Sequence, residues 1–169
     1  MINISNCLSD SDIRHTLSNL HLLTESTPDY HPFKRINYTI NRKNTNFDYL
    51  FDKCNQIFKN YIPEEHYIDE LYILKFLPGH LMKLHTDVWN TERSSNRNYT
   101  LVIQLSEASS YVGANTLIHL GNEVVQTSKE YSSGTLFKSE LEHEVTLLES
   151  GVRYSLVACF SKPRKKGLI

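Results

Sequence analysis

The second half of the sequence is a series of short β-forming segments separated by turn signals, and this pattern limits the fold more than any other feature. From Glu70 onward, runs rich in Val, Ile, Leu, Thr and Tyr are bounded by turns that contain glycine or proline. Many closely spaced strands of this kind are typical of an antiparallel sandwich or barrel. We predict strands at 71–77, 99–105, 116–120, 123–127, 135–137, 142–148 and 153–160.

Two amphipathic segments precede these strands. Ser9 is followed by acidic residues, as at a helix N-terminus, and Ile13, Leu17 and Leu20 recur at helical spacing. Apolar residues from 46 to 61 also fall on one helical face, and Pro63 follows them. A short strand is predicted at 35–40. The prediction is therefore a mainly β fold braced by two N-terminal helices.

Length and charge restrict the organisation and the partners. A chain of 169 residues is expected to form a single domain over 1–169, with a helical brace at 1–65 and a barrel core at about 66–161. The formal net charge is −1, which disfavours binding to nucleic acid or to anionic membranes. The basic tail at 162–166 is interpreted as a solvated end.

The cysteines and the N-terminus favour a cytoplasmic protein. Cys7, Cys54 and Cys159 are far apart, and an odd number of cysteines fits a reducing compartment better than a disulfide framework. We identify no signal peptide and no apolar run of the roughly 20 residues that a membrane span needs.

A candidate metal site begins at His85-Thr86-Asp87, directly after an apolar segment and a Pro78-Gly79 turn. Residues i and i+2 of an extended segment point to the same side, so the imidazole and the carboxylate can reach one ion. A second histidine would complete a two-histidine, one-carboxylate set, which suits non-haem Fe(II) and leaves coordination positions open. Alone, the motif is equally compatible with a polar turn.

Two downstream residues add context. His143 lies in an alternating segment with Val145, and Arg153 begins the last apolar strand after a Ser150-Gly151 turn. An arginine among buried residues is costly unless it meets an anion, and its planar guanidinium matches a carboxylate. The alternative for Arg153 is a salt bridge with one of the nearby glutamates.

In these segments the chain resembles the Fe(II)/2-oxoglutarate-dependent dioxygenases, and within them the prolyl-4-hydroxylase-like branch. The resemblance covers about 70–160 in the order of the family. It rests on Phe76-Leu77-Pro78-Gly79 with His85-x-Asp87, Thr100 to Leu105, Gly113 to Leu117, Gly134 to Phe137, His143-Glu144-Val145 and Gly151 to Val157.

The resemblance implies a double-stranded β-helix, a jelly-roll or cupin-like barrel, with Fe(II) as cofactor, 2-oxoglutarate as cosubstrate and O2 as oxidant. His85, Asp87 and His143 would hold Fe(II), and Arg153 would bind the distal carboxylate of 2-oxoglutarate. Further residues are expected to line the cosubstrate site, either as hydrogen-bond donors (Thr100, Gln104) or as an apolar wall (Leu117, Val145), although all four could equally be ordinary core residues.

The chain departs from the family at several positions. Many relatives have a tyrosine nine residues before the first iron-binding histidine, which bonds to 2-oxoglutarate, whereas this chain has Phe76. Tyr72 has the same strand parity but lies about 13 Å further along the strand. Met82 replaces a position that is often aromatic in peptidyl prolyl hydroxylases, and Gly113-Ala114 stands where the family has paired glycines.

Two subgroups of the family are disfavoured. Halogenating relatives lack the metal carboxylate, which is present here as Asp87, and nucleic-acid dealkylases carry a second arginine where this chain has Cys159. The polar segment at 88–98 follows the metal motif and is a candidate lid, in which Trp89 and Arg97 are candidate substrate contacts, or else an ordinary connection.

The expected function is therefore hydroxylation of an unactivated C–H bond with release of succinate and CO2. The first candidate substrate is a peptidyl or protein side chain such as proline. The second is a free amino acid or another small metabolite, which Met82 favours. A hypothesis of a different class is a non-catalytic sensor that binds 2-oxoglutarate or metal. The oligomeric state is not predicted.

Overall fold

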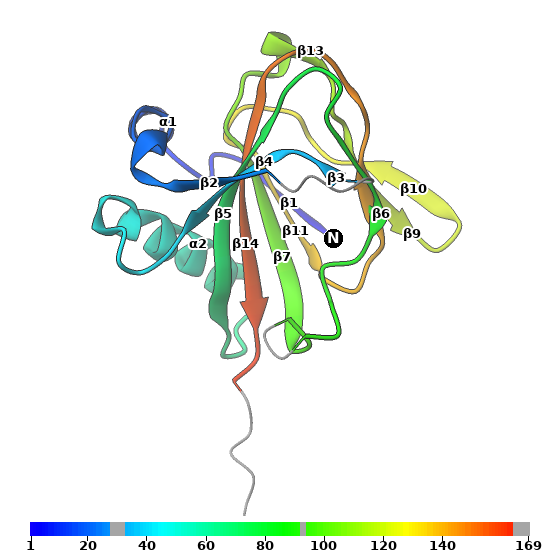
Figure 1. Ribbon diagram of the computed structural model, residues 1–169. Helices are drawn as coiled ribbons and strands as arrows, with labels where there is room; N and C mark the ends of the chain where they lie inside the picture. The colour runs from blue at the N-terminus through cyan, green and yellow to red at the C-terminus, as the bar shows by residue number, and fades with distance from the viewer. Residues whose placement is uncertain (28–32, 92–93, 164–169) are drawn as a thin grey trace, which may run out of the picture.

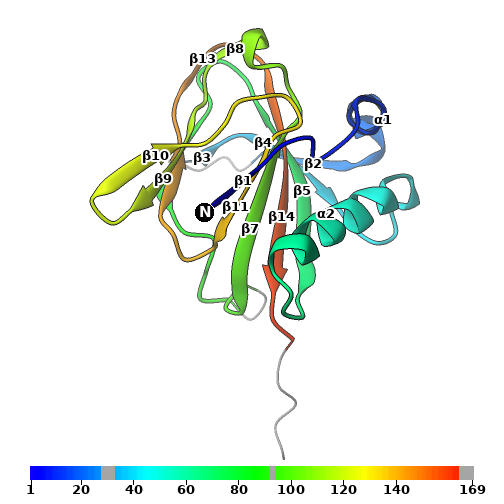
Figure 2. The ribbon, with the colours of Figure 1, turned by 180° about the vertical axis from the view of Figure 1, so that it is seen from behind.

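The structure, a computed structural model, describes residues 1–27, 33–91 and 94–163. Its strands form two facing sheets, and its two α-helices lie together on the outer side of the larger sheet (Figures 1 and 2). The prediction of a mainly β fold with two bracing N-terminal helices is confirmed. In the described part of the chain, no helix is long and apolar enough to cross a membrane.

The helices begin close to where the sequence places them. Helix α1 (Asp10–Ser18) starts with a capping box, in which the Ser9 side chain accepts from the backbone N–H of Asp12 and the Asp12 carboxylate accepts from that of Ser9. Helix α2 (Asp48–Tyr61) follows a 3₁₀ turn and buries Leu50, Phe51, Cys54 and Phe58 against the sheet. The 3₁₀ turns are η1 (Leu20–Leu22), η2 (Thr45–Phe47) and η3 (Ala108–Ser110).

The larger sheet contains seven antiparallel strands in the order β1-β11-β7-β14-β5-β4-β2. Its centre is β14, the last strand of the chain, which pairs with β7 on one side and β5 on the other. The strands are β1 (Ile2–Ile4), β2 (Thr24–Ser26), β4 (Ile36–Ile40), β5 (Tyr67–Phe76), β7 (Arg97–Gln104), β11 (Gly134–Lys138) and β14 (Arg153–Ser161).

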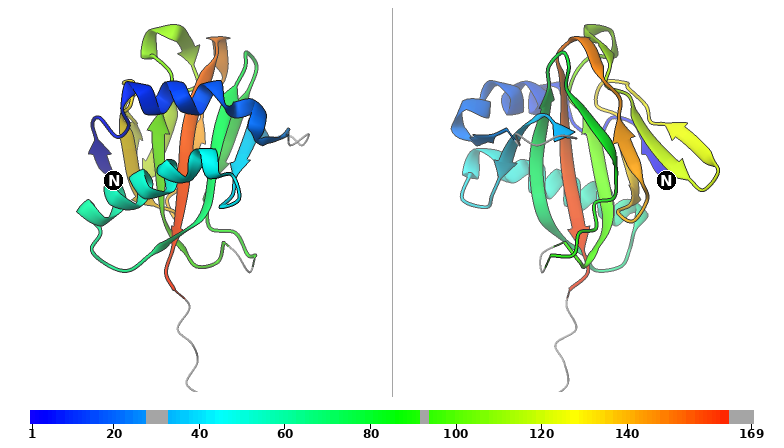
Figure 3. Two further views of the ribbon diagram at one scale, coloured as in Figure 1. Left: turned by 90° about the vertical axis from the view of Figure 1, so that its left-hand side faces the viewer. Right: turned by 45° about the vertical axis from the view of Figure 1, so that its right-hand side comes forward.

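The smaller sheet has five strands in the order β10-β9-β12-β6-β3, and β13 and β8 form a separate two-stranded antiparallel sheet. The right-hand view of Figure 3 shows the larger sheet beside the strands of the smaller sheet. The strands are β3 (Phe33–Lys34), β6 (Leu81–His85), β9 (Thr116–Leu120), β10 (Glu123–Gln126), β12 (His143–Val145), β8 (Tyr111–Gly113) and β13 (Leu148–Gly151).

Together the sheets form a double-stranded β-helix, and among the described residues they do not close into a continuous barrel. Segment 1–65, expected as a helical brace, also supplies β1, β2, β3 and β4 to the two sheets. The left-hand view of Figure 3 shows α1 and α2 crossing the outer side of the strands. The helical layer therefore covers one side of the larger sheet only.

One predicted strand is divided in two. The sequence predicts a continuous strand at 142–148, whereas the structure has β12 and β13 with a break at Thr146–Leu147. At this break the Leu147 carbonyl accepts a hydrogen bond from the N–H of Ala114, which lies in the connection between β8 and β9. A Cβ on Gly113 would lie 2.1 Å from that carbonyl oxygen, so this close approach requires glycine. Strands β1, β2, β3, β6 and β8 were not among those predicted.

Candidate metal centre

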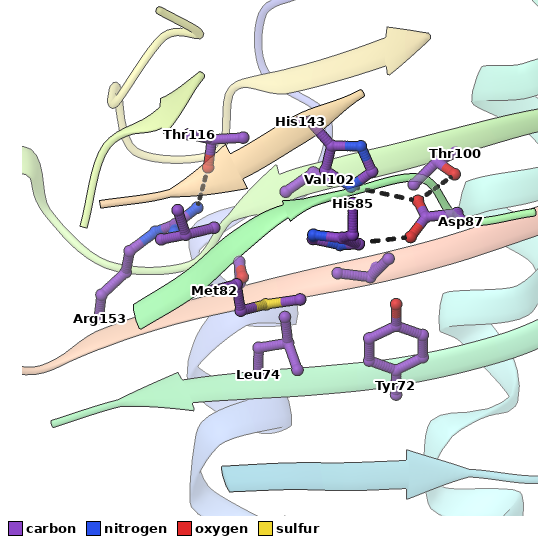
Figure 4. A pocket seen from close by; sticks show the side chains of 13 residues that line it. Tyr72, Leu74, Met82, His85, Asp87, Thr100, Val102, Thr116, His143 and Arg153 are labelled. Carbon is purple, nitrogen blue, oxygen red and sulfur yellow. Dashed lines mark hydrogen bonds and ion pairs between the residues drawn. The ribbon is translucent and has the colours of Figure 1, made fainter. Parts of the chain in front are cut away.

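Three side chains with metal-binding atoms converge at one end of the space between the sheets. Strand β12 pairs with β6 so that His143 lies directly opposite His85, and Asp87 follows the end of β6. The Nε2 atoms of His85 and His143 lie 3.8 and 3.5 Å from the Asp87 carboxylate oxygens (Figure 4). All three candidate ligand atoms lie within 4.8 Å of one another.

Backbone contacts set the orientation of both histidines. The Nδ1 atom of His85 lies 2.7 Å from the carbonyl oxygen of Lys83, and that of His143 lies 2.9 Å from the carbonyl oxygen of Leu141. A carbonyl oxygen can only accept, so each Nδ1 carries the proton and donates it. In the neutral imidazoles Nε2 then carries the lone pair, which is the state that binds a metal.

The carboxylate of Asp87 is held by a short chain of hydroxyl groups. Thr100 donates to Asp87 Oδ2 at 2.7 Å, and the hydroxyl of Ser139 lies 2.9 Å from that of Thr100. The backbone N–H of Asp87 also donates to the carbonyl of Ser139. Thr100, which was predicted either as a cosubstrate contact or as a core residue, donates to the candidate metal ligand Asp87. Ser139 was not predicted, because no local motif distinguishes it.

The three groups influence one another's pKa. Burial, and then the charge of His143, lower the pKa of His85. Burial also opposes the charged forms of His143 and Asp87, but their mutual attraction prevails: the pKa of His143 is raised and that of Asp87 is lowered. Thr100 adds to the lowering for Asp87. The lowered pKa of Asp87 favours the ionised carboxylate, which is the form that binds a cation.

The residues fit a divalent transition metal. Two imidazole nitrogens and one carboxylate oxygen on one side of an ion leave further positions open, as in non-haem Fe(II) sites. The same donors also suit Zn(II), so the donor set alone does not select the metal. Among the described residues, this is the group in which three such side chains meet.

A pocket of about 380 Å³ extends from this centre toward Arg153. Val145 lines it as predicted, but Leu117 does not; its neighbour Thr116 takes that place, because successive residues of β9 point to opposite sides. Tyr72 also lines the pocket, and its hydroxyl points toward Asp87 in Figure 4. The lining residues are Tyr72, Leu74, Met82, His85, Asp87, Thr100, Val102, Thr116, His143, Val145, Arg153, Ser155 and Val157.

Arg153 lies at the other end of this pocket and is only 1% exposed. Its Nε donates to Gln104 Oε1 at 3.2 Å and its Nη2 donates to Thr116 Oγ1 at 3.0 Å, whereas its Nη1 is buried without a hydrogen-bond partner. The guanidinium lies 5.4 Å from the ring centre of Phe76. Burial lowers the pKa of Arg153. No carboxylate among the described residues pairs with this charge, so the salt bridge considered from the sequence is not formed.

The predicted substrate contacts lie near a second, more polar pocket of about 630 Å³. Met82 and Trp89 line it, and Trp89 is 46% exposed. Arg97 also lines it, but donates from Nε to both oxygens of Asp69 and from Nη2 to Glu70. These bonds hold the C-terminal end of segment 88–98 in place. Within the candidate lid, residues 92–93 lie outside the described residues, as do 164–166 of the basic tail.

Comparisons with known proteins identify the fold. No protein-family model matches the chain, and no curated protein matches it. A 2OG-Fe(II) oxygenase family oxidoreductase from Burkholderia pseudomallei is similar in structure, with a TM-score of 0.81, 15% identity and coverage of 99% of this chain and 88% of its own. A Pseudomonas putida prolyl-4-hydroxylase has a TM-score of 0.77, 15% identity and coverage of 96% and 92%.

A third structure broadens the range of chemistry on this fold. The non-heme alpha ketoglutarate dependent epimerase SnoN from nogalamycin biosynthesis has a TM-score of 0.80 and 10% identity, with coverage of 95% of this chain and 76% of its own. The chain therefore has the fold of the 2OG-Fe(II) oxygenases, with a His-Asp-His centre in the space between its sheets.

Proposed function

We propose that this protein is an Fe(II)- and 2-oxoglutarate-dependent oxygenase that hydroxylates an unactivated C–H bond. The observation that carries the proposal is one pocket with a candidate metal centre at one end and a buried arginine at the other. A 2-oxo dicarboxylic acid has matching groups: a 2-oxo acid that can chelate a metal and a distal carboxylate that can pair with Arg153. The fold shared with 2OG-Fe(II) oxygenases supports the same assignment.

Each part of the site has a role in this proposal. His85, Asp87 and His143 would hold Fe(II), while Thr100 keeps the Asp87 carboxylate oriented. With iron bound, the centre supplies the oxidising power: O2 is consumed, 2-oxoglutarate becomes succinate and CO2, and one oxygen atom enters the substrate C–H bond. Apolar side chains in the pocket wall exclude water from the reacting groups; these are Leu74, Val102, Val145 and Val157.

For the substrate we propose a side chain in a peptide or protein, with proline as the first candidate. The second pocket opens beside the metal ligands and shares Tyr72 and Met82 with the first, so a substrate side chain can reach the metal from it. The structural likeness to a prolyl-4-hydroxylase supports this choice. The polar lining by Arg35, Asn37 and Glu70 favours the second candidate, a small polar metabolite such as a free amino acid.

The experiment is succinate release from 2-oxoglutarate in air, with Fe(II) and a panel of proline-containing peptides and free amino acids. The proposal predicts substrate-dependent succinate that requires Fe(II) and is lost in His143→Ala. Stimulation by peptides alone supports the peptidyl substrate, and stimulation by free amino acids alone supports the metabolite. Zn(II) in place of Fe(II) should give no turnover, because zinc has no redox chemistry. Binding of 2-oxoglutarate without any turnover would favour the sensor hypothesis.

A further inference from the structure

Strand β8 places a second polar group without a partner beside Arg153. The side chain of Tyr111 is buried, with 4% of the residue exposed, and its hydroxyl oxygen has no hydrogen-bond partner. The Nη1 atom of Arg153 is likewise buried without a hydrogen-bond partner. A buried polar group without a partner costs stability, and few such groups remain in folded proteins. The two groups lie close enough to influence each other's pKa, but no well-formed hydrogen bond joins them, and a carboxylate could accept from both.

The turn before β14 brings Tyr111 and Arg153 together. Tyr111 pairs in register with Gly151, two residues before Arg153, and a Cβ on Gly151 would lie 2.8 Å from the Tyr111 Cα atom. Tyr111 and Phe76 also belong to the same apolar cluster, and Phe76 is opposite Arg153 on β5. Burial raises the pKa of Tyr111, and the nearby charge of Arg153 acts against this rise.

The surroundings are positive. The Lys129 ammonium group lies 4.2 Å from the centre of the Tyr111 ring and donates to the Gly113 carbonyl. Among the described residues, no carboxylate forms an ion pair with Arg153 or Lys129. Two cations therefore lie near the Tyr111 side chain, and neither forms an ion pair with a described carboxylate. The phenolic proton needs an acceptor, and Arg153 has none to offer.

We propose that the Tyr111 hydroxyl donates a hydrogen bond to the distal carboxylate of 2-oxoglutarate and shares that carboxylate with Arg153 Nη1. This inference rests on the proposed function. The hydroxyl comes from β8, whereas the position that holds Phe76 is on β5. Tyr111 thereby compensates for the hydroxyl that Phe76 lacks, and it makes the site selective for 2-oxo acids with a second carboxylate.

Calorimetry on anaerobic, Mn(II)-loaded protein tests this inference with two probes, 2-oxoglutarate and 2-oxobutanoate, which lacks the distal carboxylate. Tyr111→Phe should weaken 2-oxoglutarate binding by about 10-fold or more, as expected for a hydrogen bond to a charged group, and leave 2-oxobutanoate binding unchanged. In the Arg153→Met background, Tyr111→Phe should have a smaller effect, because the carboxylate is no longer held beside the hydroxyl.

Equal 2-oxoglutarate affinity in wild type and Tyr111→Phe would overturn the inference and leave the proposed function intact, as would equal weakening of both probes. The ligand-free Tyr111→Phe protein should be close to wild type in stability, because the hydroxyl makes no well-formed hydrogen bond and only its weak interaction with Arg153 is lost; a marked fall in its melting temperature would also overturn the inference. A wild-type protein that binds neither probe in the presence of metal would contradict the proposed function and this inference together.

Discussion

The two faces of the seven-stranded sheet differ in composition although the same strands build both. On the face toward the helices, alternate residues such as Leu71, Ile73, Leu101 and Leu156 are apolar and buried. On the opposite face, the residues between them include Tyr72, Thr100 and Arg153. Strand alternation thus separates stability from chemistry. We expect substitutions on the helix side to change the free energy of unfolding, and those on the pocket side to change binding.

A matched pair of leucine substitutions gives the largest expected difference. Leu156→Ala, on the helix side, should lower the free energy of unfolding by about 2–5 kcal/mol, because a cavity is left in a packed core. Leu74→Ala removes the same atoms from the wall of an existing pocket and should cost less stability while weakening 2-oxoglutarate binding. Urea denaturation and calorimetry measure the two effects. Equal losses of unfolding free energy in Leu156→Ala and Leu74→Ala would contradict the separation of stability from binding between the two faces.

Arg153→Met should weaken binding strongly and change stability little. The affinity for 2-oxoglutarate is expected to fall roughly 100-fold or more, as when one partner of a buried charge pair is removed. The stability of the ligand-free protein should change little, because removing a buried charge without an ion-pair partner offsets the loss of its hydrogen bonds to Gln104 and Thr116. Calorimetry and thermal unfolding of the same preparation measure both. A strongly destabilised variant would show that Arg153 is mainly structural.

Thr100→Val tests the support of the metal carboxylate. Removing a hydroxyl that bonds to a metal ligand is expected to lower metal affinity by about 10- to 100-fold. The matched control is Thr135→Val, on the neighbouring strand, whose hydroxyl bonds to Asn3 instead. Its metal affinity should equal that of wild type. Competition with a fluorescent chelator measures both, and equal affinities in the two variants would exclude a role for Thr100 at the metal.

The smallest effect is expected at the capping box of α1, far from the pocket. Burial raises the pKa of Asp12, but hydrogen bonds with Ser9 outweigh this and the pKa is lowered. Asp12 therefore stabilises the fold above its ordinary pKa of 3.8, and this contribution is lost as the pH falls through the lower, folded value. Asp12→Asn should cost about 1 kcal/mol at pH 7 and less at pH 3. A cost that is equal at both pH values would contradict this.

The sequence predicted those parts of the site that depend on local patterns. His85 and Asp87 are two residues apart, so alternation places both on one side of an extended segment. The assignment of His143 and Arg153 to the same site came from the resemblance to the dioxygenase family. Contacts between distant segments were not predictable in this way. The register that sets Thr116 rather than Leu117 in the pocket depends on the pairing of β9 with β12, and Ser139 reaches Thr100 only in the folded chain.

The fold shows the same limit. The start of α1 was predicted from its cap, and α2 was predicted within two residues from its repeating apolar face, because both signals are local. Strands β1, β2 and β3 are two or three residues long, which is too short to show alternation. The sequence predicts β12 and β13 as one strand, because the break between them comes from a contact with the distant Gly113. Tyr111 had no motif to indicate its position beside Arg153.

The most direct test of the central claim is an anaerobic titration of the protein with Fe(II) and then 2-oxoglutarate, followed by visible absorption. If His85, Asp87 and His143 form the iron site and the same pocket binds the 2-oxo acid, a charge-transfer band is expected that needs both components and is absent in His143→Ala. A wild-type protein that binds Fe(II) and 2-oxoglutarate without such a band, or that binds neither, would contradict the account.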